Sequence, residues 1–344
     1  MKRILIIVLV GAGLIGLGGG GWIYYWKHKA TLVPLGAEQP AISKNLEQYD
    51  FDALRLRGGK AGAFELLGEP KEVTILRKRI KEKVTWVSKE YRFMSDGKWV
   101  SGVINVPVLR QAQDVKRYPT IIMIRGYAEK VGYYPGSGSW KMADYLAKEG
   151  YVTISIDFLG YGLSDSESSD VMEARFAKVS QVLDLLATIK QQSFVDPARV
   201  GIWAHSNGGQ IALSVLEATG EDYPTVLWAP MTQPFPQSVL DTSESDPDGG
   251  AGARAMIAQF TKYYDARRYA FENYYSWVKS PVEIFQGTHD VWCKVEWQQT
   301  VVDALNTHGQ QATLRVVEGD DHNFSKNWEQ VAKETLAYYR LNKG

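Results

Sequence analysis

A chain of 344 residues with 45% hydrophobic content can bury the core of one large domain, with or without an appended segment. Lysine and arginine together number 39, as do aspartate and glutamate, so the basic surplus typical of nucleic-acid-binding proteins is absent. The single cysteine, Cys293, excludes an internal disulfide and a cysteine-based zinc site.

Residues 1–29 are predicted to be a membrane anchor. Residues 4–26 carry no charge, and such a stretch is long enough for a helix to span the hydrocarbon core. Basic residues flank it on both sides, and four aromatic side chains lie within 22–26, as in an interfacial aromatic belt. A short basic tail before an apolar run indicates a signal anchor, which would place the rest of the chain outside the cytoplasm. A cleaved signal peptide is the alternative, although residues 18–21 match a cleavage site poorly.

Residues 11–16 read Gly-Ala-Gly-Leu-Ile-Gly and match the glycine pattern of dinucleotide-binding folds. The context contradicts that interpretation, because a helix should follow these glycines. Four consecutive glycines and an aromatic cluster follow instead, and glycine is a poor helix former in water. No apolar strand ending in an acidic residue follows at the required distance. We therefore predict no nucleotide cofactor. No metal is predicted either.

Residues 30–71 are predicted to be a linker and lead-in segment, because they are polar at first and only weakly periodic afterwards. Residues 72–107 alternate between polar and apolar side chains, which predicts several antiparallel strands. The dipeptide Asp96-Gly97 within them is typical of a β-hairpin turn. The main domain is predicted to begin with these strands and to occupy residues 72–344.

Short apolar strands alternate with helices from residue 119 onward, which implies an α/β fold with a mostly parallel sheet covered on both faces. Functional residues of such a sheet lie in the loops at the C-terminal ends of the strands. Residues 231–279 interrupt the alternation and are predicted to form a lid or cap over the active site. Strands are predicted over 120–125, 151–157, 199–204, 225–228, 282–285 and 313–317, and helices over 140–149, 173–191 and 210–218.

The catalytic nucleophile is predicted to be Ser206. The pentapeptide Ala204-His205-Ser206-Asn207-Gly208 lies between a predicted strand and a predicted helix, where a G-x-S-x-G nucleophile elbow is expected. Small residues are needed on both sides because a larger Cβ would clash in so tight a turn, and Ala204 is an acceptable departure. The turn directs the Asn207 N–H toward a developing oxyanion. The alternative for Ser206 is an ordinary helix N-cap, and His205 is predicted to be a packing residue.

Asp290 and His322 are predicted to be the acid and the general base. Each follows a predicted strand, and the order Ser, Asp, His along the chain is the order that this fold expects. Histidine can take and return a proton near neutral pH while a carboxylate holds its other nitrogen. Asp320 and Asp321 are too near His322 in sequence to reach behind its ring. His289 is the alternative base, but its strand end suits the acid better.

The second oxyanion donor is predicted at the end of the first parallel strand. Gly126 there lets the backbone approach a substrate, and the N–H of Tyr127 points to the same oxyanion. The next strand is followed by a glycine-containing loop at 157–165. This loop lacks the Gly-Lys-Ser/Thr of a phosphate-binding loop, so it is predicted to be structural.

From about residue 85 to the C-terminus the chain resembles the α/β-hydrolase superfamily, in particular the catalytic domain of prolyl-oligopeptidase-like serine peptidases and related esterases. The resemblance implies an acyl-serine mechanism without a metal or cofactor. It does not extend to oligopeptidase specificity, because the family's N-terminal propeller is not expected here and its usual His-Gly is Arg125-Gly126. The motifs that carry it are AHSNGG at 204–209, DFLGYGLSD at 157–165, GTHD at 287–290 and EGDDHNF at 318–324.

The sequence therefore predicts a membrane-anchored serine hydrolase that acts on a small-molecule ester or a short peptide. Its alternative from another class is a non-catalytic, membrane-tethered binding protein on a hydrolase scaffold. Decayed scaffolds usually lose a catalytic residue, and all three candidates are present here. A membrane-bound dehydrogenase is a third interpretation, which would require nicotinamide binding.

Overall fold

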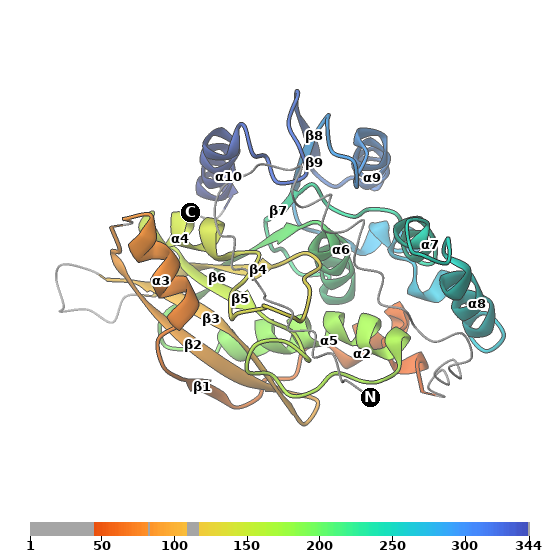
Figure 1. Ribbon diagram of the computed structural model, residues 1–344, viewed down its shortest axis with the longest axis horizontal. Coiled ribbons are helices and arrows are strands. Elements are labelled where there is room, and N and C mark those ends of the chain that lie inside the picture. The colour runs from red at the N-terminus through yellow and green to blue at the C-terminus, as the bar shows by residue number, and fades with distance from the viewer. Residues whose placement is uncertain (1–44, 82, 109–116, 343–344) are drawn as a thin grey trace, which may run out of the picture.

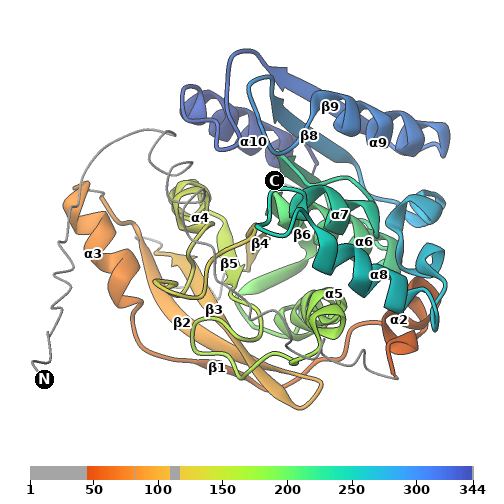
Figure 2. The same ribbon diagram turned by 45° about the vertical axis from the view of Figure 1, so that its right-hand side comes forward.

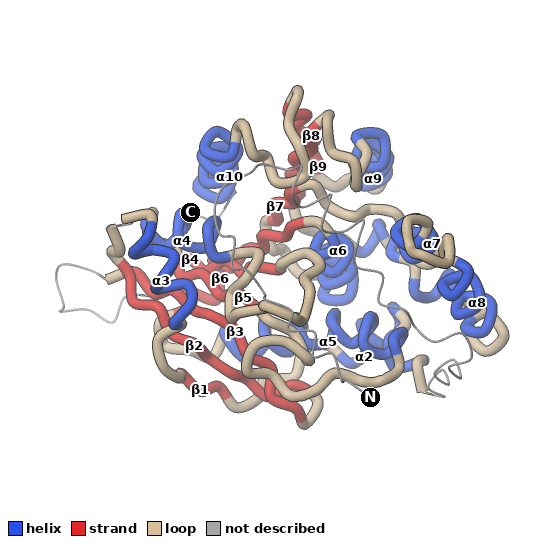
Figure 3. The backbone as a smooth tube through the Cα atoms, in the orientation of Figure 1, coloured by secondary structure: helices blue, strands red, loops and turns tan. Residues whose placement is uncertain are grey.

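The computed structural model describes residues 45–81, 83–108 and 117–342. A nine-stranded sheet within these residues forms the centre of the molecule, in the order β1-β2-β3-β5-β4-β6-β7-β8-β9 (Figures 1 and 3). The first three strands are antiparallel lead-in strands, and the other six run parallel to one another. The predicted α/β fold with a mostly parallel sheet is thus confirmed. The strands are β1 Phe64–Leu66, β2 Trp86–Ser95, β3 Lys98–Pro107, β4 Tyr118–Ile124, β5 Val152–Ile156, β6 Val195–His205, β7 Thr225–Trp228, β8 Val282–Gly287 and β9 Ala312–Val317.

Helices cover both faces of the sheet, as Figure 2 shows. One face carries the larger apolar core, to which four helices contribute, and the opposite face carries a second core beneath two others. Every residue of β5 and β8 is buried, as expected for parallel strands enclosed on both faces. The helices of the first face are α2 Phe51–Arg57, α5 Val171–Ile189, α6 Asn207–Thr219 and α9 Val295–Thr307, and those of the second are α4 Trp140–Lys148 and α10 Trp328–Asn342.

The β2–β3 hairpin turns at Asp96-Gly97, as predicted. Both residues have positive φ, 45° and 78°, which suits the tight turn that joins two right-twisted strands. Ten residue pairs then continue the antiparallel ladder from this turn. The lead-in strands therefore extend the parallel sheet through β3, which pairs with β5.

The prediction of strands throughout residues 72–107 is wrong at its beginning, where α3 (Lys71–Arg79) forms a helix. Val73 and Arg77 are its buried residues and lie one helical turn apart. Arg77 reaches a buried carboxylate, Asp144 on α4, so a charged residue occupies an inward-facing position. A pattern based on apolar side chains alone could not recognise that turn.

The second half of the segment predicted as linker and lead-in, residues 30–71, attaches to the hydrolase core. Phe51 and Leu54 of α2 belong to the larger core, and β1 pairs with β2. The predicted anchor at 4–26 lies outside the described residues. Among the residues that the structure describes, no helix combines the length and apolar character needed to cross a bilayer.

The predicted cap, residues 231–279, contains α7 (Gln237–Ser243), α8 (Ala251–Phe260) and three short 3-10 turns. It is attached to α5 by a cluster of aromatic rings. Phe176 of α5 lies 5.1 Å from Phe235 and 4.9 Å from Tyr269, measured between ring centroids. In both ribbon views α7 and α8 lie beside α5 and α6 (Figures 1 and 2). Coverage of the active site by this segment stays a prediction.

Candidate active site

Ser206 lies in a strained turn between β6 and α6, as the sequence predicted. Its φ of 54° and ψ of −124° belong to a region that residues with a side chain rarely adopt. Backbone hydrogen bonds hold the turn: the Ser206 N–H donates to the carbonyl of Trp228 at 3.0 Å, and the Ser206 carbonyl accepts from Gly209 and Met231. Such a turn presents the serine hydroxyl at the C-terminal edge of the sheet.

The glycines around Ser206 permit backbone contacts that no side chain would allow. A Cβ on Gly208 would lie 2.4 Å from the carbonyl oxygen of Ile124. A Cβ on Gly126 would lie 2.8 Å from the Cβ of Ser206. The loop at the end of β4 is therefore pressed against the turn that carries Ser206.

The predicted acid and base are hydrogen-bonded to each other. His322 Nδ1 lies 2.7 Å from Asp290 Oδ2, although 32 positions separate the residues. The other oxygen of Asp290 accepts from the N–H groups of Trp292 and Cys293 at 2.8 and 3.0 Å. The side-chain amide of Gln286 donates to Oδ2 at 2.9 Å.

This hydrogen-bonding arrangement keeps Asp290 ionised. Burial acts to raise the pKa of Asp290, but the hydrogen bond and the charge of His322 act against it. The N–H of Cys293 and the amide of Gln286 act in the same direction, and the net result is a pKa below the ordinary value. An ionised Asp290 can fix the tautomer of His322 and stabilise its imidazolium form.

His205, predicted to be a packing residue, also contacts the base. Its Nε2 lies 3.0 Å from the carbonyl oxygen of His322, and the two ring centroids are 4.9 Å apart. Burial, together with the charge of His322, lowers the pKa of His205 to about 4. The neutral ring therefore donates its Nε2–H to that carbonyl. His205 thus links the nucleophile turn to the loop that carries His322.

The loop after β9 is organised by Asp320, a fully buried carboxylate. It accepts backbone hydrogen bonds from Asp321, Lys326 and Asn327. A Cβ on Gly287 would lie 2.3 Å from the Asp320 carbonyl oxygen, so the loops after β8 and β9 touch backbone to backbone. This contact brings Asp290 and His322 together.

No hydrogen bond joins Ser206 Oγ to His322 among the described residues. The residues lie on adjoining loops, because His205 precedes Ser206 and binds the His322 carbonyl. Catalytic hydrogen bonds in substrate-free sites are often long and tighten only when a substrate binds. The structure therefore brings the three predicted residues to one edge of the sheet, with the Ser206–His322 link open.

The predicted oxyanion donors lie on both sides of Ser206. Asn207 is the first residue of α6, where backbone N–H groups have no partner within the helix. Tyr127 follows Gly126, which lies against Ser206. The Tyr127 side chain is 59% exposed, and its hydroxyl donates to Glu129 at 3.2 Å, so only its backbone suits the predicted role.

Arg125 positions the β4 loop, a role that the sequence did not predict. The guanidinium is buried and donates to the carbonyl of Gly126 at 2.8 Å and to that of Asp157 at 2.6 Å. The Asp157 carboxylate in turn accepts from the hydroxyl of Tyr133 and the N–H of Gly136. These bonds order the loop at 157–165 and fit its predicted structural role.

Asp290, Cys293 and His322 offer ligand atoms within 4.8 Å of one another. The residues fit an acid–base pair better than a metal site, because His322 Nδ1 already bonds to Asp290. Burial raises the pKa of the Cys293 thiol well above its ordinary value, and nearby Asp290 adds to the effect. Metal ligation requires a thiolate, which this environment disfavours.

A parallel sheet with a strained serine after one strand and a bonded histidine–carboxylate pair on the following loops defines an α/β-hydrolase. Residues 137–342 match the prolyl oligopeptidase family, and the chain belongs to that family. The chain is therefore assigned to the serine hydrolases, the broad class to which this family belongs.

Two curated relatives have different named activities. Esterase FrsA of Yersinia enterocolitica is 28% identical over 207 residues, which are 58% of this chain and 46% of that protein. Probable dipeptidyl-aminopeptidase B of Penicillium rubens is 25% identical over 158 residues, 40% of this chain and 16% of that protein. The chain thus spans less than half the length of either relative.

Solved structures share the fold at low sequence identity. A puromycin-hydrolyzing peptidase of Mycobacterium tuberculosis superposes with a TM-score of 0.60 at 17% identity, over 76% of this chain and 40% of that one. The Pyrococcus furiosus esterase Pf2001 gives a TM-score of 0.54 at 17% identity, over 83% and 97%. These likenesses support the fold assignment alone.

Proposed function

We propose that the chain cleaves an ester or amide bond through an acyl-serine intermediate. Ser206 is the nucleophile, His322 the general base, and Asp290 the carboxylate that orients His322. The observation that carries this assignment is the 2.7 Å hydrogen bond between His322 and Asp290, on loops adjoining the strained Ser206 turn.

The reaction follows from these positions. His322 Nε2 takes the Ser206 hydroxyl proton as Oγ attacks the carbonyl carbon, and the N–H groups of Asn207 and Tyr127 hold the resulting oxyanion. His322 then gives its proton to the leaving alcohol or amine. Water, deprotonated by His322, releases the acid and restores Ser206. Substrates are small-molecule esters or short peptides.

A fluorophosphonate probe tests the nucleophile directly. We expect it to label the wild-type chain at Ser206 and to leave Ser206→Ala unlabelled. His322→Asn should label far more slowly, because the serine then lacks its base. Equal labelling of wild type and Ser206→Ala would refute the assignment.

Esterase and peptidase activities are separated by paired substrates. Hydrolysis of p-nitrophenyl acyl esters and of aminoacyl p-nitroanilides is measured side by side at equal enzyme concentration. Turnover of the anilides assigns peptidase activity, and turnover confined to the esters assigns a carboxylesterase. Absence of both activities and of probe labelling would favour a non-catalytic binding protein.

We also propose that residues 4–26 anchor the chain in a membrane, with the catalytic domain outside the cytoplasm. The support is the uncharged length of this segment, its basic flanks and its aromatic end.

A further inference from the structure

Two cationic side chains on α5, Arg175 and Lys178, form no ion pair with any described residue. Arg175 and Lys178 lie about one turn apart and are both partly buried. Within the part of the chain that the structure describes, neither forms an ion pair or donates a hydrogen bond to a carboxylate. By contrast, the buried guanidinium of Arg77 is bonded to a carboxylate, that of Asp144. Desolvated charges are ordinarily paired.

Arg175 is held close to the nucleophile by neutral groups. Its Nη2 donates to Gln210 Oε1 at 2.7 Å and to Ser238 Oγ, on α7 of the cap, at 2.8 Å. The amide of Gln210 donates onward to Asn207 Oδ1, and Asn207 directly follows Ser206. Nε and Nη1 of Arg175 form no hydrogen bond with any described residue, so they can bind a ligand.

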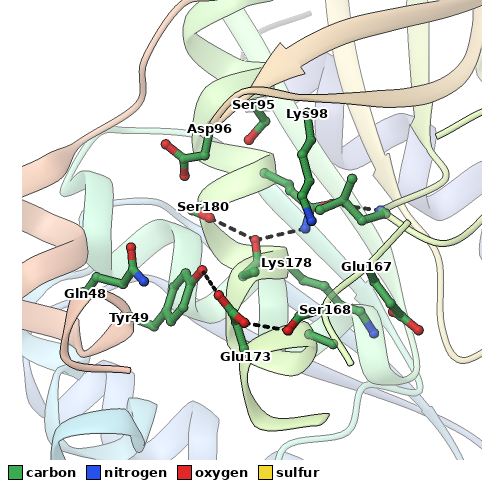
Figure 4. A pocket seen from close by; sticks show the side chains of 14 residues that line it. Gln48, Tyr49, Ser95, Asp96, Lys98, Glu167, Ser168, Glu173, Lys178 and Ser180 are labelled. Atoms are coloured by element: carbon green, nitrogen blue, oxygen red, sulfur yellow. Dashed lines mark hydrogen bonds between the residues drawn. The ribbon is translucent and has the colours of Figure 1, made fainter. Parts of the chain in front are cut away.

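Lys178 supplies a second charge from a neighbouring pocket of about 310 Å³, shown in Figure 4. The pocket lies between α5, the β2–β3 turn, the loop after β5 and the 3-10 turn Glu47–Tyr49. The carboxylates in its wall are already engaged: Asp96 pairs with Arg57, Glu167 with Lys130, and Glu173 accepts from Tyr49 and Ser168.

No carboxylate offsets the burial of Arg175, and Glu167 offsets that of Lys178 only in part. Burial lowers the pKa of Arg175 to about 10. Burial, followed by repulsion from Arg125 and Arg175, lowers the pKa of Lys178 to about 8. An anion bound beside Arg175 and Lys178 would relieve both effects.

We propose that Arg175, with Lys178 behind it, binds a carboxylate on the acyl group of the substrate. The acyl side is indicated because Gln210 connects Arg175 to Asn207, the residue whose N–H we assign to the acyl oxygen. Guanidinium groups bind carboxylates through directed, charge-assisted hydrogen bonds. This inference rests on the proposed function and narrows its substrates to half-esters or half-amides of dicarboxylic acids.

The test compares acyl groups with and without a carboxylate on the full-length chain. Mono-p-nitrophenyl esters of succinate, glutarate and adipate are paired with the same esters capped as methyl esters. For at least one of the three acids, we expect kcat/KM of the acid ester to exceed kcat/KM of its capped ester by about tenfold or more in the wild type. A ratio of about 10 corresponds to the loss of one charge-assisted hydrogen bond.

Arg175→Met should reduce that ratio about tenfold, and Arg175→Lys should retain part of it. Arg92→Met is the matched control, because Arg92 pairs with Glu65 on the lead-in strands and should keep the wild-type ratio. A ratio unchanged in Arg175→Met would overturn the inference. This includes the case in which kcat/KM falls equally for the acid and the capped esters, because an equal fall would show that Arg175 has a purely structural role.

Competition provides a test that needs no variant. Succinate, glutarate or adipate should inhibit hydrolysis of a capped ester by wild type, whereas sodium chloride at equal ionic strength should not. If capped esters are hydrolysed but none of the acids competes or is preferred, the carboxylate site is refuted and the serine hydrolase assignment stands. If no ester is hydrolysed and Ser206 is not labelled, the proposed function itself is wrong.

Discussion

At the scale of single residues, the site depends on a few side chains that hold the base in place. His205 binds the His322 carbonyl, Gln286 binds Asp290, and the carboxylate of Asp320 accepts hydrogen bonds from three backbone N–H groups of its own loop, the loop that carries His322. None of these residues performs chemistry in the proposed mechanism, yet each fixes the direction of a catalytic group. Misplacement of such a group by about 1 Å is enough to slow a reaction a hundredfold.

His205→Phe should lower kcat about 10- to 100-fold with little change in KM, because the ring is kept but the hydrogen bond to His322 is lost. His205→Gln should recover part of the rate, since its amide can donate from a similar position. Steady-state kinetics on a p-nitrophenyl ester measures both variants. Equal activity of the Phe and Gln variants would show that His205 only fills space.

Glu217 of α6 is a buried carboxyl whose two oxygens have no hydrogen-bond partner among the described residues. Burial raises its pKa well above the ordinary value of 4.5, so the folded chain binds a proton that the unfolded chain releases. Stability from this group is complete below pH 4.5 and is lost as the pH rises toward the folded pKa.

Glu217→Gln should remove this loss. Its melting temperature relative to wild type should rise by about 2 °C or more between pH 5 and pH 8. Thermal unfolding followed by circular dichroism at the two pH values measures the difference. The exposed variant Glu69→Gln is the control and should show no such trend. A pH-independent difference for Glu217→Gln would contradict a buried, protonated carboxyl.

The triad candidates could be predicted from the sequence, whereas their supporting residues could not. Ser206, Asp290 and His322 each follow a predicted strand, and that position is visible in the order of residues. The role of His205 depends on where the loop after β9 returns to β6, which is a distance in space. The sequence indicated Gln286 only as a polar side chain near the end of a fully buried strand, which also contains Glu283.

At the scale of elements, the parallel strands could be predicted because strands enclosed on both faces are continuously apolar. Three helices, α4, α5 and α6, could be predicted in the segments between those strands. The helix α3 was missed because its inward face includes the charged Arg77. Arg77 donates to both oxygens of Asp144, at 2.7 and 2.5 Å, and also to Ser88. This buried ion pair fastens α3 to α4 across the edge of the sheet.

Asp144→Asn alone should destabilise the fold by about 3–5 kcal/mol, because it leaves the Arg77 guanidinium buried without a counterion. Replacing both residues, as Arg77→Met with Asp144→Leu, should restore most of that loss. Urea unfolding measures the free energies. Arg340→Met, which breaks the exposed pair with Glu149, is the control and should cost less than about 1 kcal/mol. A double variant no more stable than Asp144→Asn would contradict this account.

At the scale of the whole molecule, one continuous sheet joins the lead-in strands to the catalytic half. β1 and α2 precede residue 72, yet they pair with β2 and enter the larger core. The sequence could not reveal this attachment, because α2 and β1 are too short to show a clear period. The segment before residue 45 lies outside the described residues, and its role rests on composition.

Deletion of residues 1–29 should move the protein from the membrane fraction to the soluble fraction, because the deletion removes the 4–26 apolar run. Cell fractionation followed by alkaline carbonate extraction measures this difference. Protease added to intact cells should cleave the full-length chain if its catalytic domain lies outside the cytoplasm. Full-length protein that washes off in carbonate would count against the anchor.

The aromatic attachment of residues 231–279 to α5 has a consequence for how substrate preference can diversify. The loops after β8 and β9 touch backbone to backbone, so an insertion in either would displace the reacting groups. Within the 231–279 segment, the part from Phe235 to Tyr269 packs its rings around Phe176, whereas Phe271, Tyr275 and Val278 belong to the larger core. We therefore expect changes between Phe235 and Tyr269 to alter which acyl groups are accepted, while the reacting groups keep their positions.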